Sequence, residues 1–283
     1  MKRKRLLTFK DWAKNIDRED RYGETYKGDI NCMGVAEILE GAPKHVKGDF
    51  TCSGSQLISL QGGPEIVDGR FMVNIASIKD FRGAPKKVQK FVAHLCRELT
   101  STKGFPKDVQ GSIAITVCPN LTKIEDFPDE VHGDLDFSRS GITSLEGCPQ
   151  FIRDKLLLIN TKITSLKGCP KEVEFIDATT ETLEKLEDYP EDVEDVIIHP
   201  KVIDKIFKDG LRLIEQGKVI IIPTLRTRSS SDLVYRQLHR YITREKKMTL
   251  DSFSKLENIE RALIIQELYD DYIPSDLEDL LMI

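Results

Sequence analysis

Apolar residues recur along this chain with a period of about 21 residues. The period is marked by eight prolines spaced by 20 to 22 residues, namely Pro43, Pro64, Pro85, Pro106, Pro128, Pro149, Pro170 and Pro190. Valine or isoleucine follows each proline by three positions, and glycine or aspartate precedes it by two. A repeat of this length predicts a solenoid, in which each unit packs only against its neighbours.

Within each unit, apolar and polar residues alternate as on a β-strand with one buried face. Phe50 and Cys52 show this alternation in one unit. Leu135 and Phe137 show it in another. We predict a short strand in every unit, with these apolar side chains inward, followed by a bend. The glycine–any residue–proline step would close each coil, because glycine permits unusual dihedral angles and proline fixes φ.

The extent of the repeat divides the chain into three predicted regions. The solenoid would span residues 24–199 and form a β-rich, leucine-rich-repeat-like array of the α/β solenoid class. Residues 1–23 contain a short amphipathic segment with Phe9 and Trp12 on one face, which predicts an N-terminal helical cap. Residues 200–283 lose the 21-residue period and show helical periodicity, so we predict a mainly α-helical C-terminal domain.

Composition narrows the class of protein further. The 283 residues are 40% hydrophobic and 31% charged, which suffices for a core and excludes a disordered chain. The net charge of −5 argues against a general polyanion binder. The apolar run at residues 219–222 is far shorter than the roughly 20 residues that span a bilayer. The basic start is not followed by a signal-peptide core. We therefore expect a soluble, cytoplasmic protein.

Residues that could carry chemistry are sparse. The chain has no phosphate-binding glycine motif, no HExxH motif and no CxxC pair, so we expect no cofactor, no metal and no enzymatic activity. The six cysteines are expected to be buried as small apolar side chains. We expect His94 to be a partly buried, hydrogen-bonded residue rather than a catalytic base. Asp126, Glu130, Asp134 and Asp136 could suggest a cation site, but dispersed solvated acids are the simpler interpretation.

The order of residues in each unit resembles the short leucine-rich repeats of bacterial effector proteins. The closest match is Ile-Thr-Ser-Leu at residues 142–145, echoed at residues 163–166. The Gly-x-Pro coils are also similar to those of proteins from large bacteriophages. The strand carries one extra residue, and the asparagine ladder of ordinary leucine-rich repeats is absent. The resemblance covers residues 24–198 and implies binding of another protein on the strand-lined surface, as in a phage or bacterial host-interaction factor.

That resemblance carries no catalytic activity over to this chain. Some bacterial relatives have a C-terminal ubiquitin-ligase domain with a catalytic cysteine. This chain has no cysteine after Cys169, so that activity is not expected.

The outward strand positions form the predicted protein-binding surface. They are Asp49, Thr51, Arg70, Met72, Phe91, Ala93, Ser112, Ala114, Asp134 and Asp136. The middle of this surface, around Met72 and Phe91, would be an apolar patch of the kind that marks partner sites. Lys90 replaces the usual glycine in one coil, so a shifted register stays open, in which Phe91 and Leu95 belong to the core.

A second candidate surface lies in the basic segment at residues 226–247. Its predicted contacts with phosphate are Arg236, Arg240, Arg244, Lys246 and Lys247. Spacing by four would place the three arginines on one helix face, which could bind nucleic acid. The alternative is a solvated face paired with acidic residues of the following helix. A nucleic-acid-associated protein is therefore the second prediction, and the identity of the protein partner and the oligomeric state stay open.

Overall fold

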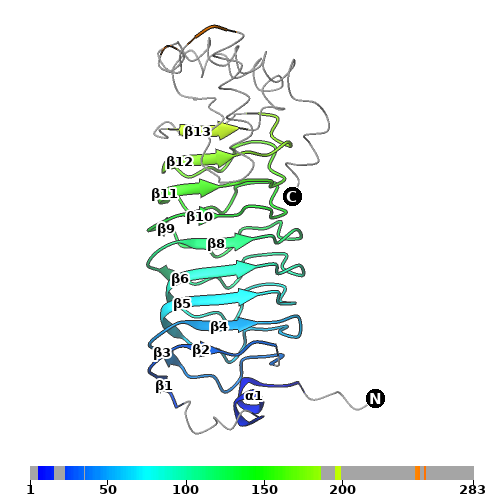
Figure 1. The fold of residues 1–283 in the computed structure, drawn as a ribbon, viewed down its shortest axis with the longest axis vertical. Coiled ribbons are helices and arrows are strands. Elements are labelled where there is room, and N and C mark those ends of the chain that lie inside the picture. The colour runs from blue at the N-terminus through cyan, green and yellow to red at the C-terminus, as the bar shows by residue number, and fades with distance from the viewer. Residues whose placement is uncertain are drawn as a thin grey trace, which may run out of the picture.

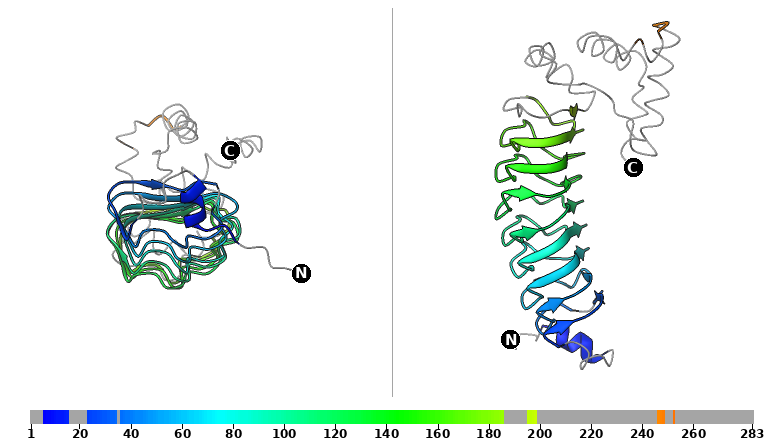
Figure 2. Two further views of the ribbon diagram at one scale, coloured as in Figure 1. Left: turned by 90° about the horizontal axis from the view of Figure 1, so that it is seen from below. Right: turned by 90° about the vertical axis from the view of Figure 1, so that its left-hand side faces the viewer.

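A computed structural model describes residues 6–15, 23–34, 36–185, 195–198, 246–248 and 252 of the chain. The strands of successive coils stack in one parallel sheet that rises from the N-terminal to the C-terminal end of the array (Figure 1). Seen along its axis, the coils superpose on one another (Figure 2). This confirms the prediction of a β-rich solenoid.

Four coils contribute two separate strand segments to this sheet, and the coil of β13 has only the second segment among the described residues. The first segment is β1 (Thr25–Tyr26), β3 (His45–Val46), β7 (Asp108–Val109) or β9 (Glu130–Val131). It follows the repeat proline in every one of these coils except that of β1, which precedes the first proline of the chain. The second segment is β2 (Ile30–Asn31), β4 (Phe50–Ser53), β8 (Ile113–Thr116), β10 (Leu135–Asp136) or β13 (Asp195–Ile198). In the remaining coils, one longer strand contains both segments: β5 (Ile66–Asn74), β6 (Lys87–His94), β11 (Phe151–Leu157) and β12 (Glu172–Ala178).

The core is built from columns of identical or similar side chains. Phe50, Phe71 and Phe91 share one register position on β4, β5 and β6 and are fully buried. The ring centroids of Phe50 and Phe71 lie 5.8 Å apart, and those of Phe71 and Phe91 lie 5.6 Å apart. Each coil thus buries its apolar edge on the next, which stabilises the fold by about 1.5–3 kcal/mol for each large side chain.

Two local motifs of the repeat close each coil. Gly62, two residues before a proline, has a φ of +78°, and a Cβ there would lie 2.5 Å from the Cα of Glu40 in the previous coil. Only glycine fits such a close backbone approach. The serine of the Ile-Thr-Ser-Leu motif forms a turn, since Ser144 Oγ accepts a hydrogen bond from the backbone N–H of Glu146 at 3.1 Å. These recurring positions of the repeat therefore serve the fold.

A third motif ends the strand of seven coils with a residue of left-handed backbone. These residues are Gly34, Gly54, Ile75, Leu95, Val117, Arg139 and Asn160. Each lies four positions after the inward residue that begins the second strand segment. In the coils of β5, β6, β8, β10 and β11 the residue after it turns into the core, as the buried Cys96 does after Leu95. Ser55, which follows Gly54, is exposed instead. The left-handed residue therefore makes the sharp corner at which the chain leaves the sheet.

The helix α1 (Phe9–Asn15) lies at the N-terminal end of the array (Figure 1). Thr8 and Asp11 bond reciprocally at its start, because Thr8 Oγ1 accepts from the N–H of Asp11 at 3.1 Å and the Asp11 carboxylate accepts from the N–H of Thr8 at 3.0 Å. The ring of Phe9 packs on Phe50, with centroids 6.2 Å apart. The helix thereby covers the first rung of the phenylalanine column.

The predicted C-terminal domain falls largely outside the described residues. Arg236, Arg240 and Arg244 are not among the described residues, whereas Lys246 and Lys247 are. No helix in the described part of the chain is long and apolar enough to cross a membrane.

Candidate functional site

The outward side chains of the second strand segments form three columns along the solenoid axis. The first column contains Asp49, Arg70, Lys90, Ser112 and Asp134. The central column contains Thr51, Met72, Val92, Ala114, Asp136 and Leu157. The third column contains Ser53, Asn74, His94 and Thr116. Eight of the ten residues predicted for the surface lie in the first two columns.

The other two predicted residues, Phe91 and Ala93, are fully buried, so their outward placement is wrong. The reason is one missing residue. Val67 and Phe71 are separated by three residues, whereas Val88 and Phe91 are separated by two. Because side chains alternate along a strand, the lost residue moves every later position of β6 to the opposite face relative to the simple repeat count. Val92 therefore takes the outward place in the central column.

The shifted register was the alternative that the sequence left open, and half of it is confirmed. Phe91 belongs to the core, as that alternative requires. Leu95 does not, because it is only half-buried and occupies the left-handed corner with a φ of +57°. The coil is thus shifted by one residue from the strand through the corner at Leu95. It regains the repeat count by Leu99, which lies 14 residues after its proline, as Ile78 does in the preceding coil.

Asp49 and Arg70 in the first column hold neighbouring coils together. Oδ1 of Asp49 accepts a hydrogen bond from the backbone N–H of Arg70 at 2.8 Å, and Oδ2 accepts from Nη2 of Arg70 at 3.0 Å. The backbone hydrogen bond from Arg70 is the main cause that lowers the pKa of Asp49 below its ordinary value. Ser112 Oγ accepts from the N–H of Asp134 at 3.2 Å in the same way. These residues therefore have a structural role besides any contact with a partner.

Lys90 differs from its neighbours in the first column. Its side chain is exposed, and within the described part of the chain no carboxylate forms an ion pair with it. It stands beside Arg70 in the register of β5 and β6. Lys90 is thus a cation of the strand face whose charge is available to a partner.

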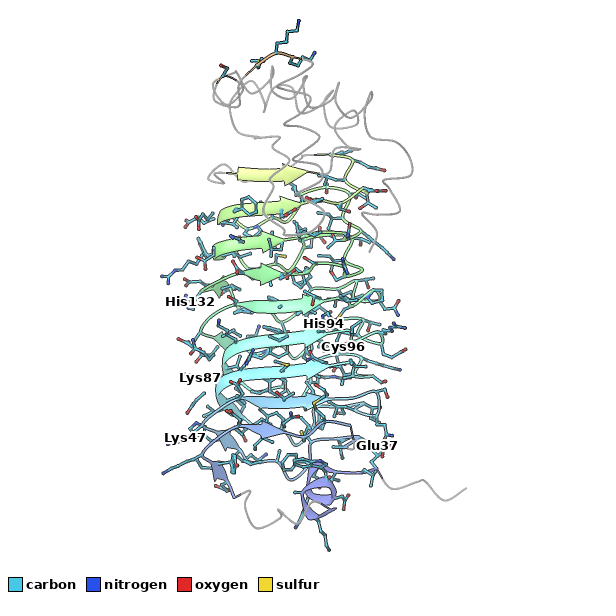
Figure 3. All side chains as sticks on the ribbon, viewed as in Figure 1. Glu37, Lys47, Lys87, His94, Cys96 and His132 are labelled. Atoms are coloured by element: carbon cyan, nitrogen blue, oxygen red, sulfur yellow. The ribbon has the colours of Figure 1, made fainter. Side chains whose placement is uncertain are left out.

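The third column is polar and partly engaged. His94 lies at the end of β6, close to Cys96, which follows the corner at Leu95 (Figure 3). Its Nδ1 is 2.8 Å from Thr116 Oγ1, and the residue is half-buried, which confirms the expected satisfied histidine. Oδ1 of Asn74 in the adjacent coil is buried and has no hydrogen-bond partner among the described residues. Such an oxygen costs about 1–3 kcal/mol unless something donates to it.

The acidic residues offered for a cation do not gather. The described residues contain no group of three or more potential metal ligands, and Asp126 adopts the left-handed conformation of the coil-closing glycine, with a φ of +56°. Farther along the strand face, burial raises the pKa of Asp177, and the charge of Asp136 adds to the shift. Both carboxylates accept a hydrogen bond from the backbone N–H two residues on, at Ser138 and Thr179.

The thiols are part of the core, as predicted. Five cysteines are buried and Cys169 is half-buried. Burial raises the pKa of Cys32 and of Cys169 to about 12. Thiols in this state are poor nucleophiles because the thiolate is the reactive form.

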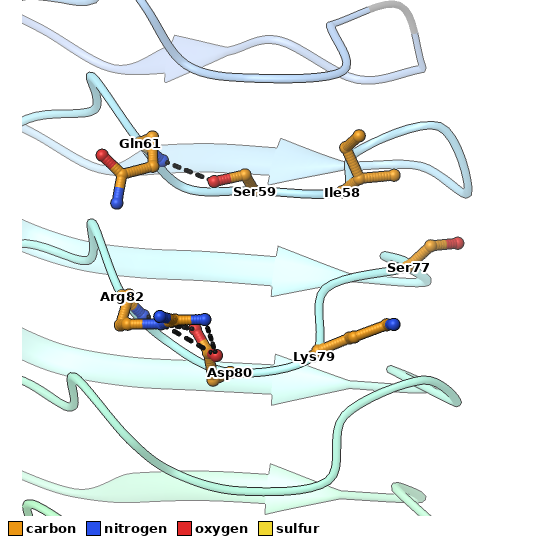
Figure 4. A pocket seen from close by; sticks show the side chains of 7 residues that line it. All are labelled: Ile58, Ser59, Gln61, Ser77, Lys79, Asp80 and Arg82. Carbon is orange, nitrogen blue, oxygen red and sulfur yellow. Dashed lines mark hydrogen bonds and ion pairs between the residues drawn. The ribbon is translucent and has the colours of Figure 1, made fainter.

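A shallow groove lies on the return segments of two coils, away from the three columns (Figure 4). Its lining residues are Ile58, Ser59, Gln61, Ser77, Lys79, Asp80 and Arg82. Nη2 of Arg82 is 2.8 Å from Oδ2 of Asp80, so these opposite charges satisfy each other. Ser59 Oγ accepts from the backbone N–H of Gln61 at 3.2 Å. The polar groups of the groove are therefore largely used within the chain.

Sequence reasoning missed the outward apolar residues at the corners, Ile75, Leu95 and Val117. A signal for this position exists, because the first two coils place glycine there, at Gly34 and Gly54. Aligning the units on the inward strand residue rather than on the proline brings these glycines and the three apolar residues into one column.

Comparison of the chain with protein-family models, with curated proteins and with solved structures found no match.

Proposed function

We propose that the protein is a non-enzymatic binding module that holds another protein on the strand face of its solenoid. The observation that carries this proposal is the apolar strip formed by Met72, Val92 and Ala114 on adjacent strands. The strip is flanked by charged residues of the first column and polar residues of the third. An apolar centre with a polar rim is typical of protein interfaces. A stacked array also presents such a surface with little ordering cost on binding.

Support for binding over catalysis comes from the state of the reactive side chains near this face. Nδ1 of His94 is held by Thr116 Oγ1, and Cys96, two residues farther along the chain, is fully buried. A general base or a nucleophile must instead be free to reach substrate. We accordingly propose no enzymatic activity.

We also propose the finer class and organisation that the repeat suggests. The solenoid is of the leucine-rich-repeat-like kind, residues 1–23 provide an N-terminal helical cap and residues 200–283 form a mainly helical domain. The packing of Phe9 on Phe50 supports the cap. A cytoplasmic location in a bacterial cell, and a role in phage or bacterial host interaction, rest on the resemblance of the repeat alone.

The proposal is tested by capture from bacterial lysate with the intact chain, with nuclease and at two salt concentrations. We expect a protein to be retained at both concentrations and to be lost with the double variant Met72→Asp, Val92→Asp. A matched control is Thr143→Asp with Thr164→Asp, which places two charges on exposed positions of the return segments. The control should capture the same protein as the unchanged chain. Capture that is equal for both double variants would contradict the proposal.

The same experiment separates the alternative function. Nucleic acid bound through Arg236, Arg240 and Arg244 would be released steeply as salt rises, because phosphate contacts release counterions. It would also be removed by nuclease and unaffected by Met72→Asp. That outcome would favour a nucleic-acid-associated protein over a protein-binding strand face.

A further inference from the structure

Three neighbouring coils place bulky apolar residues where the backbone is left-handed. Ile75, Leu95 and Val117 have φ values of +55°, +57° and +55°. Left-handed backbone is unfavourable for residues with a side chain, and most of all for β-branched residues such as isoleucine and valine. We name these three residues the left-handed ridge.

The fold itself does not demand bulky residues at this corner. Gly34 and Gly54 occupy it in the first coils, and Arg139 and Asn160 occupy it farther along. Glycine and asparagine enter the left-handed region at low cost. The ridge is therefore a choice of side chain that costs the fold stability, and strain of this kind concentrates at functional sites.

The ridge coincides with two other unsatisfied features. Ile75 is 55% exposed, and among the large apolar residues that the structure describes only Met33 is more exposed. Oδ1 of Asn74, beside it, is buried without a hydrogen-bond partner among the described residues. Met72 on β5 and Val92 on β6 each lie three positions before the ridge residue of their coil. Exposed apolar surface, strained backbone and an unpaired amide oxygen thus meet within three coils.

The charge of the central coil defines what this surface attracts. Residues 85–105 contain five basic residues and one acidic residue, a net charge of +4 in a chain of net charge −5. Lys90 projects from this coil in the first column, and no described carboxylate pairs with it. A partner carrying carboxylates would therefore be attracted to the coil that holds Val92 and Leu95.

We propose that the left-handed ridge, together with Met72 and Val92, docks a peptide segment of a partner protein that combines apolar and acidic residues. The apolar side chains of the segment cover the ridge, and a carboxylate of the segment pairs with Lys90. This inference rests on the proposed function, since it assigns the chemistry of the partner to the same strand face.

A second copy of this chain fits the surface less well. In the second copy, the coil of residues 128–148 has five acidic residues and one basic residue, which would complement the positive charge of residues 85–105. That coil carries Arg139 rather than an apolar residue at the corner. It would bring a further cation toward the basic coil, so a separate acidic and apolar segment is the better occupant.

The test is selection of a random library of displayed 12-residue peptides on the intact chain. Peptides that also bind the double variant Ile75→Asn, Leu95→Asn are removed in each round. We expect the remaining pool to be enriched in peptides with several carboxylates among apolar residues. Their dissociation constants should rise about tenfold or more with Lys90→Glu and with Ile75→Asn, which corresponds to loss of one good contact.

A matched control separates binding from folding. Asn160→Ile puts isoleucine at the same corner of another coil, and we expect it to lower the melting temperature and to leave peptide affinity unchanged. Ile75→Asn should do the opposite, with an unchanged or higher melting temperature and weaker binding. If Ile75→Asn instead lowered the melting temperature as a core substitution does, the ridge would be a requirement of the fold and the inference would be overturned.

The composition of the selected pool distinguishes the two proposals. Ridge-dependent peptides that are neutral or basic would overturn the acidic chemistry and leave the strand face as a protein-binding surface. A pool that contains no ridge-dependent peptide would overturn this docking site. The proposed function would then be judged separately, by whether the double variant Met72→Asp, Val92→Asp still loses the protein that the unchanged chain captures from lysate.

Discussion

The coils of β5, β6 and β8 and the coils of β10 and β11 have the same backbone and different surfaces. Both regions bury an aliphatic or aromatic side chain at the start of the second strand segment, such as Phe71 or Leu135. At the corner, the first region has Ile75, whereas the second has Arg139 and Asn160. The repeat therefore fixes the inward residues and leaves the corner free to vary, and the variation marks where a partner is expected.

The largest effect is predicted for the inward column, where the two regions should not differ. Phe71→Asp and Leu135→Asp each place an unpaired charge among fully buried residues, and each should lower the free energy of unfolding by about 4 kcal/mol or more. Urea unfolding followed by circular dichroism measures this loss. The exposed control Thr143→Asp should change the stability by less than about 0.5 kcal/mol. A mild effect of Phe71→Asp alone would show that the coils of the ridge have a weaker core.

A smaller loss is predicted at the coil-closing glycines. Gly62→Ala introduces a Cβ 2.5 Å from the Cα of Glu40 at a φ of +78°, so the free energy of unfolding should fall by about 2 kcal/mol. Asp126→Gly is the matched reversal, because Asp126 holds the equivalent position with a φ of +56°. It relieves the left-handed strain but loses the hydrogen bond that the Asp126 carboxylate accepts from the N–H of Gly104 at 2.8 Å, so it should change the stability less than Gly62→Ala. Denaturant midpoints compare the two variants. Equal destabilisation by both substitutions would contradict a steric role for the glycine.

The corner is expected to give effects of opposite sign in the two regions. Asn160→Ile should lower the free energy of unfolding by about 1–2 kcal/mol, because a β-branched residue is forced into left-handed backbone. Ile75→Asn removes the same strain and should not lower it. Differential scanning fluorimetry of the two single variants measures the signs. Two shifts in the same direction would show that the corner of each coil is set by packing rather than by backbone strain.

The smallest effect is predicted for two aspartates whose pKa values shift in opposite directions. The folded-state pKa of Asp177 is raised, so its contribution favours the fold at low pH and is lost as pH rises from the unfolded-state pKa through the folded one. The folded-state pKa of Asp49 is lowered, so its contribution is present at neutral pH and is lost as pH falls through that range. Asp177→Asn should therefore stabilise the protein slightly at neutral pH, whereas Asp49→Asn should destabilise it.

Urea midpoints measured between about pH 3 and pH 7 test this pair against unfolded-state pKa values near 4. The difference between Asp177→Asn and the unchanged chain should shrink toward acidic pH. A pH-independent gain would mean that removal of the buried charge of Asp177 is not the cause. Asp49→Asn serves as the internal reference. The loss of stability that it causes at neutral pH should also shrink at acidic pH, because protonation of Asp49 then removes the stabilising charge from the unchanged chain.

The solenoid could be predicted because its signal is carried by residues with few alternatives. Two patterns predict inward packing, and the structure confirms both. One is an aliphatic residue three positions after a proline, and the other is the alternating pair Phe50 and Cys52. The placement of Phe91 failed because counting from the proline assumes a constant distance to the strand, and β6 is one residue shorter there. Register on a strand alternates with every residue, so a single deletion inverts the prediction.

The surface was less predictable than the core for a physical reason. Asp49 reads as an exposed acid, yet it spans two coils by accepting from the N–H of Arg70, a contact between residues 21 positions apart. Ile75 reads as a core residue or a strand residue, because isoleucine rarely adopts a positive φ. In both cases the sequence shows the side chain, and only the stacked backbone shows what that side chain faces.

The one-residue difference in β6 has a genetic consequence. The segment between Val88 and Phe91 lies just before the inward position, and the shorter connection still delivers Phe91 onto the phenylalanine column. Loss or gain of a single codon at this point is thus absorbed locally, and neighbouring coils keep their pairing. Such in-frame insertions or deletions would change the surface residues of one repeat at a time during evolution and leave the core residues of the other repeats unchanged.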